Sequence, residues 1–176
     1  MTKAMPEGGE EREPGSIAPR AFRDAMSRFT TGVCVVTTVG RDGAPAGVTV
    51  SSLTSLSLEP PLVLYCLGKR TTGGDIYTEG SAFALNLLAD DQLNVSETFA
   101  SQDADKFASV AYHTGEGGCA LLDGCLANLE CTRQAVLDGG DHVIIVGRVQ
   151  CIHAGPAKHP LLRYRGRYMR LGEVAV

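Results

Sequence analysis

Apolar residues recur along this chain first at helical spacing and then in short runs rich in β-branched side chains. We expect an amphipathic helix from Ala21 to Phe29, because four apolar residues share one of its faces, and Pro19 suits its first turn. Gly32 would end this helix. The apolar face comprises Phe22, Ala25, Met26 and Phe29.

From residue 33 onward the pattern is mainly that of strands. Strands are expected over 33–39, 46–57, 62–67, 82–88, 121–137, 143–153 and 161–171. Short helices are expected over 71–78 and 91–100, the second capped by Asp90 or Asp91. Because helices do not alternate regularly with strands, this mainly β order favours a closed antiparallel barrel with peripheral helices over a Rossmann sheet.

Length and composition limit the class of protein. A chain of 176 residues predicts one domain, over 19–176, and the Glu-, Pro- and Gly-rich residues 1–18 predict a disordered tail. Hydrophobic residues make up 44% of the chain, yet no run approaches the roughly 18 apolar residues of a membrane span. Without an apolar signal core at the N-terminus, we expect a cytoplasmic protein. The net charge of −4 argues against general binding to nucleic acid or to a membrane.

The six cysteines include no Cys-x-x-Cys pair, and most lie in apolar stretches. We therefore expect small buried side chains in a reducing compartment. His153 and His159 lie near Cys151, but two histidines in a loop are more often surface residues, and we predict no bound metal. The Gly-x-Ser-x-Gly elbow of hydrolases and the phosphate loop of nucleotide-binding enzymes are missing from the sequence.

Hydroxyl side chains are concentrated between Gly47 and Ser57, just before a Pro-Pro pair. On a strand, Thr49, Ser51 and Ser55 cannot all lie in the core. One interpretation is an edge strand that is wetted on one face. The other is a lining of hydroxyl and backbone donors for a flat heterocycle such as a flavin ring, which carries carbonyls and ring nitrogens along one edge.

Two further segments carry candidate chemistry. The sequence Gly139-Gly140-Asp141-His142 is either a turn with an exposed histidine or a site where His142 contacts a nicotinamide or assists proton movement. Residues 162–170 interleave arginine with tyrosine, and if extended they place Arg163, Arg165 and Arg167 on one face. That face could be solvated, or bind single-stranded nucleic acid or an anionic cofactor. The acidic chain favours a small phosphorylated ligand over a polymer.

Taken together, these segments resemble the flavin reductase family, the small reductase components of two-component monooxygenases. The resemblance runs from about Pro19 to Gly172. Its landmarks, in chain order, are Phe22-Arg23, Phe29–Val33, Thr49–Val63, Phe83–Leu88, Phe99-Ala100, Asp105–Phe107, Leu129–Cys131, Gly140–His142 and Leu161–Tyr168. The resemblance implies a split β-barrel of the FMN-binding, Greek-key-like type, a homodimer, and a flavin, FAD or FMN, in a groove near the dimer interface.

The resemblance also implies the residues of the site. His142 would lie beside the nicotinamide as the catalytic position, and Arg163–Gly166 would cradle NADH. The implied cofactor-binding residues are Ala46, Gly47, Val48, Thr49, Ser51, Ser52, Cys66, Leu67, Gly68, Thr72, Phe99, Lys106, His142, Arg163, Tyr164, Arg165 and Gly166. Gly73-Gly74 departs from the family's usual pattern beside the flavin phosphate, which leaves the choice between FAD and FMN open.

The implied activity is reduction of FAD or FMN by NADH, with the reduced flavin diffusing to a partner monooxygenase. Hydride passes from nicotinamide C4 to flavin N5, so the protein mainly has to stack two rings. Backbone donors near flavin N1 and O2 would stabilise the charge that grows on reduction. The alternatives are a non-catalytic flavin or heme binder on the same barrel, and a nucleic-acid module built on Arg163–Arg170. Gly140–His142 favours the enzyme, because a storage module needs no nicotinamide site.

Overall fold

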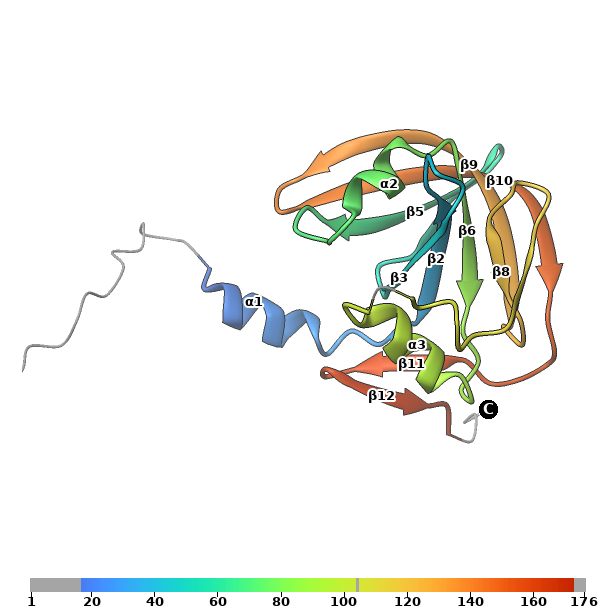
Figure 1. Ribbon diagram of the computed structural model, residues 1–176. Coiled ribbons are helices and arrows are strands. Elements are labelled where there is room, and N and C mark those ends of the chain that lie inside the picture. The colour runs from blue at the N-terminus through green and yellow to red at the C-terminus, as the bar shows by residue number, and fades with distance from the viewer. Residues whose placement is uncertain (1–16, 104, 173–176) are drawn as a thin grey trace, which may run out of the picture.

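The computed structural model describes residues 17–103 and 105–172. Most of the expected disordered tail, residues 1–16, lies outside the described residues. The fold is mainly β, as predicted, and its main element is a seven-stranded antiparallel sheet that curls into a split barrel (Figure 1). In spatial order its strands are β3 (Pro45–Val50), β2 (Cys34–Val39), β6 (Ala82–Leu87), β9 (Ala127–Gly139), β10 (His142–Ala154), β5 (Pro61–Gly68) and β4 (Thr54–Leu58).

Two smaller sheets and three helices lie around the barrel. One sheet consists of β1 (Thr31–Gly32), β11 (Leu161–Tyr164) and β12 (Arg167–Arg170), and the other of β7 (Tyr112–Thr114) and β8 (Ala120–Leu122). The helices are α1 (Pro19–Met26), α2 (Gly74–Glu79) and α3 (Leu93–Ala100). Within the described ranges, none of them is both long and apolar enough to cross a membrane.

The core has two main parts, one inside the barrel and one under α3. Inside, β5 and β6 meet where the rings of Tyr65 and Phe83 pack edge to face, with centroids 5.3 Å apart. Under α3, Phe99 packs with Val35 of β2 and Leu88. Because β2 therefore faces apolar neighbours on both sides, its run of β-branched residues is almost continuously buried.

A buried asparagine ties the small β7–β8 sheet to the barrel. Asn86 is fully buried on β6, and its amide nitrogen donates to the Val35 carbonyl at 3.0 Å. Its amide oxygen accepts from the Leu122 backbone N–H at 2.8 Å and from the Asn128 side chain at 2.7 Å. A polar side chain is tolerated at this depth because its donor and acceptor groups have partners.

The predicted first helix exists but ends earlier, at Met26, and stands apart from the barrel (Figure 1). None of its residues is buried, and Phe22 is 59% exposed. Phe29, just after the helix, is 70% exposed. The apolar face read from the sequence is therefore left uncovered by the described part of this chain.

Several strand boundaries differ from the prediction. The segment 46–57 is two strands, β3 and β4, separated by 51–53, so the pairing register is not continuous across the hydroxyl-rich run. The segment 121–137 is likewise divided into β8 and β9, because Gly124 takes a positive φ of 78° in the turn between them. The cap predicted for α3 is wrong: Gln92, not Asp90 or Asp91, occupies the N-cap position, and it makes no side-chain cap.

The last predicted strand, 161–171, is a hairpin. Arg165 and Gly166 have positive φ values of 48° and 73° and form the turn between β11 and β12. The expectation that Arg163, Arg165 and Arg167 share one strand face is therefore wrong. Arg163 lies opposite Tyr168 across the hairpin.

Candidate active site

The barrel has a seam between its two edge strands, β3 and β4. β4 pairs with β5 only as far as Leu64, so among the described residues Cys66 and Gly68 have no strand partner on that side. Backbone groups alternate between the two edges of a strand, so Gly68 faces the same side as Cys66. The Gly68 carbonyl accepts a hydrogen bond from the Thr71 N–H at 2.9 Å, so the open main-chain group at the end of β5 is the Gly68 N–H.

Two hydroxyl groups hold the seam together. The Ser52 hydroxyl accepts a hydrogen bond from the Cys66 N–H at 2.9 Å and donates one to the Cys66 carbonyl at 3.0 Å. The Thr49 hydroxyl donates to the Ser96 carbonyl of α3 at 2.7 Å. These two hydroxyls are occupied by the fold itself. The expected hydroxyl lining is thus reduced to the exposed Ser51 and to the backbone of β3.

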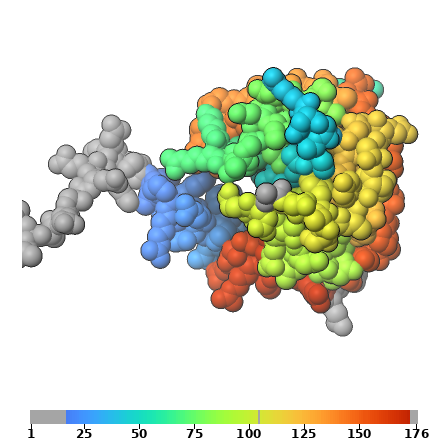
Figure 2. Space-filling model, in the orientation of Figure 1, coloured from blue at the N-terminus to red at the C-terminus, as the bar shows by residue number. Residues whose placement is uncertain are grey.

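A continuous groove follows the seam. A hollow of about 680 Å³ lies between β3 and the end of α3, and a hollow of about 260 Å³ continues it to His142. A third, of about 610 Å³, extends toward α1 and Arg163. The first and second share Thr49 and Gly68, and the second and third share Ser51 and Ser52. Figure 2 shows the surface hollowed where blue α1, the green segment around α2 and the yellow-green end of α3 face one another.

The structure brings most of the expected site residues to this groove or to an adjoining hollow of about 250 Å³ beside α2. The residues so placed are Ala46, Gly47, Val48, Thr49, Ser51, Ser52, Cys66, Leu67, Gly68, Thr72, Phe99, Lys106, His142, Arg163, Arg165 and Gly166. Tyr164 is not among the residues that line these hollows. Its ring lies 5.5 Å from the Arg165 guanidinium.

Phe99 and Lys106 line the hollow of about 680 Å³, and Gly47, which lines the adjoining hollow of about 250 Å³, lies against Phe99. Phe99 is fully buried and packs edge to face on Phe107, with centroids 4.9 Å apart, so it supports the groove from beneath. A Cβ at Gly47 would overlap the Phe99 ring, so glycine is required there. The Lys106 ammonium donates to the Phe99 carbonyl at 3.1 Å and to the Gly47 carbonyl at 3.4 Å. Partial burial lowers the pKa of Lys106.

His142 begins β10 and is held in place by its neighbour. Its Nδ1 lies 2.7 Å from an Asp141 carboxylate oxygen, and this hydrogen bond lowers the pKa of Asp141. A carboxylate only accepts, so Nδ1 carries the proton and Nε2 is left for another partner. Nε2 lies beside Gly68, since a Cβ built there would be 3.7 Å from it. His142 therefore shares one hollow with Thr49–Ser52, as the resemblance implied.

Sequence reasoning missed Arg70, a second cation beside the predicted Lys106. Arg70 lines the hollow of about 680 Å³ together with Lys106, Thr71 and Gln102. Lys69, by contrast, forms an ion pair with Asp138 at the neighbouring hairpin. The signal was present as the basic pair at 69–70. It was not decisive, because a turn follows β5 and no strand periodicity says which of the two side chains faces the groove.

The β11–β12 hairpin limits the third hollow. The Arg163 guanidinium stacks over the Tyr168 ring at 4.4 Å. The Tyr168 hydroxyl accepts a hydrogen bond from Ser96 of α3 at 2.9 Å. The Arg165 N–H donates to the Ser27 carbonyl just after α1, at 2.8 Å. The hairpin thus links α1 and α3 across the end of the groove.

Residues 26–172 match the family model described as a flavin reductase like domain. The chain belongs to the flavin reductase-like family. It is 40% identical over 153 residues to a protein of Rhodococcus jostii named "Flavin-dependent monooxygenase, reductase subunit HsaB", covering 87% of this chain and 78% of that one. It is 46% identical over 131 residues to a "Probable flavin reductase" of Rhizobium meliloti, covering 74% of this chain and only 42% of the relative.

Solved structures agree with this family assignment. The Streptomyces globisporus NADH:FAD oxidoreductase SgcE6, solved in complex with NAD and FAD fragments, superimposes with a TM-score of 0.85 at 35% identity. The match covers 93% of this chain and all of that one. The split barrel described above is therefore the fold of flavin reductases. Flavin reduction is the activity that goes with membership of this family.

Proposed function

We propose that this chain is an NADH-dependent reductase that takes up FAD or FMN, reduces it, and releases it by diffusion to a separate flavin-dependent monooxygenase. The observation that carries the proposal is the hollow shared by His142 and Thr49–Ser52, which opens into the larger groove. A groove of several hundred Å³ with few polar groups is typical of a cofactor site.

The residues present fit a flavin. Its ring system would lie against the β3 backbone and the open end of β5, where Ser51 and Gly68 offer donors. Its phosphate would lie in the largest hollow, where Arg70 and Lys106 supply positive charge and Thr72 a hydroxyl. Partial burial of Lys106 strengthens its attraction for an anion, because the local dielectric is lower than that of water.

When bound, a flavin accepts hydride at N5 from the nicotinamide of NADH. The chain supports this transfer mainly by holding two flat rings in contact along the seam. His142 Nε2, which the Asp141 contact leaves free, would form a hydrogen bond with the nicotinamide carboxamide and fix the ring. Backbone N–H groups at the seam would stabilise the negative charge that develops on reduction. No general acid is required.

The relatives support the finer parts of the proposal. The Rhodococcus protein is named a reductase subunit of a monooxygenase, which favours an oxygenase partner for this chain. The Streptomyces protein is named an NADH:FAD oxidoreductase, which favours NADH and FAD among the candidates. A cytoplasmic location goes with the same proposal, since NADH is available there and all six cysteines are free thiols.

A homodimer is also part of the proposal. The exposed Phe22, Met26 and Phe29 form an apolar surface beside the third hollow, and Leu58 of β4 is 93% exposed. Large apolar side chains grouped in this way mark an interaction surface. A second copy of this chain would cover them and bound the groove at its α1 end.

The deciding experiment measures initial rates for FAD and FMN, each with NADH and NADPH. We expect NADH oxidation that depends on added flavin, and reduced flavin that passes a dialysis membrane to an acceptor on the far side. Tight flavin binding with no NADH oxidation would instead favour a non-catalytic flavin-binding protein. Reduced flavin that stays with the protein would count against release by diffusion.

A further inference from the structure

Outside the seam, one more group of ligating side chains lies toward the far end of β10. Glu130 of β9 and Cys151 and His153 of β10 place one donor atom each within 4.8 Å of one another. In the sequence, Cys151 and His153 are near only His159 among candidate ligands, and that group led to no prediction of a metal. The donor contributed by the neighbouring strand could not be read from spacing within a single segment.

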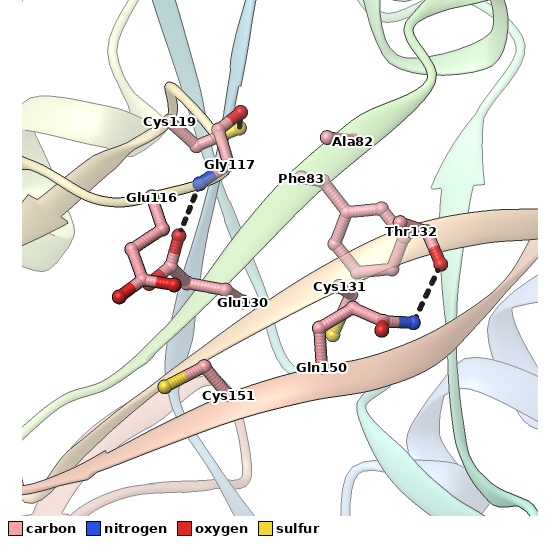
Figure 3. Close-up of a pocket in the computed structure, with 10 residues that line it drawn as sticks. All are labelled: Ala82, Phe83, Glu116, Gly117, Cys119, Glu130, Cys131, Thr132, Gln150 and Cys151. Carbon is pink, nitrogen blue, oxygen red and sulfur yellow. Dashed lines mark hydrogen bonds between the residues drawn. The ribbon is translucent and has the colours of Figure 1, made fainter.

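Strand geometry explains why the three donors meet. Cys151 and His153 are two residues apart on β10, so their side chains share a face. Cys151 is also the register partner of Glu130 on β9. Figure 3 shows Glu130 reaching from β9 toward Gly117, with Glu116 beside its carboxylate and Cys151 on the neighbouring strand. Except for His153, these residues line a small cavity of about 100 Å³.

The carboxylate of Glu130 is already oriented for coordination. Its side chain is only 5% exposed, and its Oε2 accepts a hydrogen bond from the Gly117 N–H at 2.7 Å. The other oxygen, Oε1, lies 2.8 Å from His153 Nε2. Ligand atoms in a tetrahedral zinc site lie about 3.5 Å apart, so a shift of about 0.7 Å would admit a cation between these two atoms.

We propose that Glu130, Cys151 and His153 bind one Zn²⁺ ion. A thiolate, an imidazole and a carboxylate form a donor set that suits zinc, whereas Mg²⁺ and Ca²⁺ take oxygen ligands only. The fourth position faces the cavity and is open to water or to Glu116. Binding forms a sulfur–zinc bond and releases the Cys151 thiol proton to the buffer, and His153 gives up the Nε2 proton that it shares with Glu130 and keeps one on Nδ1, with no change of oxidation state.

The ion would have a structural role separate from flavin reduction. His142 lies at the other end of β10, so the two sites share no residue. Because Gly117 holds Oε2 while the metal holds Oε1, the ion would link the 115–118 loop to the β9–β10 pair. Zinc should therefore stabilise the folded chain without changing its flavin reductase activity.

The test uses the full chain, treated with a chelator and kept reduced, then titrated with Co²⁺ and afterwards with Zn²⁺. We expect one equivalent of Co²⁺ to give a thiolate-to-cobalt charge-transfer band that Zn²⁺ abolishes. Cys151→Ser should remove this band, and His153→Gln should weaken binding at least about tenfold. His159→Gln is the matched control and should bind as the wild type does. Reductase activity of each variant reports whether it has folded.

Three results would overturn the proposal: no charge-transfer band, equal Zn²⁺ affinity in Cys151→Ser and the wild type, or loss of binding in His159→Gln alone. Thermal unfolding gives an independent measurement. Zn²⁺ should raise the unfolding temperature of the wild type and leave that of Cys151→Ser unchanged. An equal rise in both would place the bound zinc elsewhere. Glu130→Gln is left as a supporting variant, because it also removes a partner of the 115–118 loop.

Discussion

The Ser52 hydroxyl and the Cys66 backbone form a reciprocal pair across the seam of the barrel, with one hydrogen bond accepted at 2.9 Å and one donated at 3.0 Å. Ser52 lies just before β4 begins at Thr54, so a side chain here takes the place of one main-chain pair in the β4–β5 ladder. The open Gly68 N–H lies directly beyond this pair.

Ser52→Ala should therefore destabilise the fold by about 1–3 kcal/mol, because it leaves the Cys66 N–H and carbonyl without their partner. It should also weaken flavin binding, since the seam no longer holds its spacing. The matched control is Ser51→Ala, whose exposed side chain should change the free energy of unfolding by less than about 0.5 kcal/mol. Urea unfolding measures the free energy of unfolding of both variants. Equal stability of the two variants would contradict this account of the seam.

His142→Ala should raise the Michaelis constant for NADH about tenfold, the equivalent of one lost hydrogen bond of about 1.4 kcal/mol, and should affect flavin affinity less. Asp141→Asn keeps the imidazole but removes the carboxylate that fixes its tautomer, so its effect should be intermediate. Steady-state kinetics with flavin and NADH varied separately distinguish the two constants. An unchanged Michaelis constant for NADH in His142→Ala would remove this histidine from the nicotinamide site.

Gly47→Ala should destabilise the chain by about 1–3 kcal/mol, because its new methyl group overlaps the buried Phe99 ring and forces it to move. Gly32→Ala is a suitable control, since nothing lies within 4 Å of the Cβ it would introduce. Chemical denaturation of the chain without flavin isolates this effect from ligand binding. Similar costs for both substitutions would show that the Phe99 contact is not the cause.

Lys106 gives a pH-dependent prediction. Partial burial lowers its pKa below the ordinary value of about 10.4, so at alkaline pH the unfolded chain binds more protons than the folded one. The free energy of unfolding of the wild type should then rise with pH, relative to Lys106→Met, between the lowered pKa and the ordinary one. Urea unfolding of both proteins across this range measures the difference. A free energy of unfolding that falls with pH, relative to Lys106→Met, would refute this prediction.

Phe22→Asp should shift the chain from dimer to monomer, because it places a charge on the apolar surface of α1 that a second copy would bury. Ile152→Asp, at a position on β10 that is 65% exposed, should leave the oligomeric state unchanged. Light scattering coupled to gel filtration gives the mass of each. A monomeric wild type would end the dimer proposal.

Much of the fold was predictable from local patterns. The strands predicted at 33–39 and 62–67 lie within the barrel sheet as β2 and β5. β2 begins one residue later than predicted, and β5 is longer by one residue at each end. The resemblance also placed His142 with Thr49–Ser52, although these residues are far apart in the sequence. Family motifs in a fixed order along the chain indicate which distant residues meet, whereas the periodicity of apolar residues indicates only local structure.

Other features could not be predicted because tertiary contacts decide them. Arg165 takes a positive φ that is uncommon for a residue with a side chain, so Gly166 alone signals a turn within 161–171, and one glycine did not outweigh the strand pattern around it. Gln92 uses its side chain to bind the Ala89 N–H, which leaves the two aspartates outside the cap position. Phe99 lines the groove with a ring that is fully buried, because Gly47 lets it pack directly on β3.

The seam has one more consequence. Within the described residues, the outer edge of β3 and the Gly68 N–H of β5 have no strand partner, so a flat molecule lying between them would take the place of a strand. Loading with ligand and completion of the sheet would then be one event. Release of the bound molecule would then break only the hydrogen bonds that it made itself. The hydrogen bonds between the strands of the sheet would stay intact.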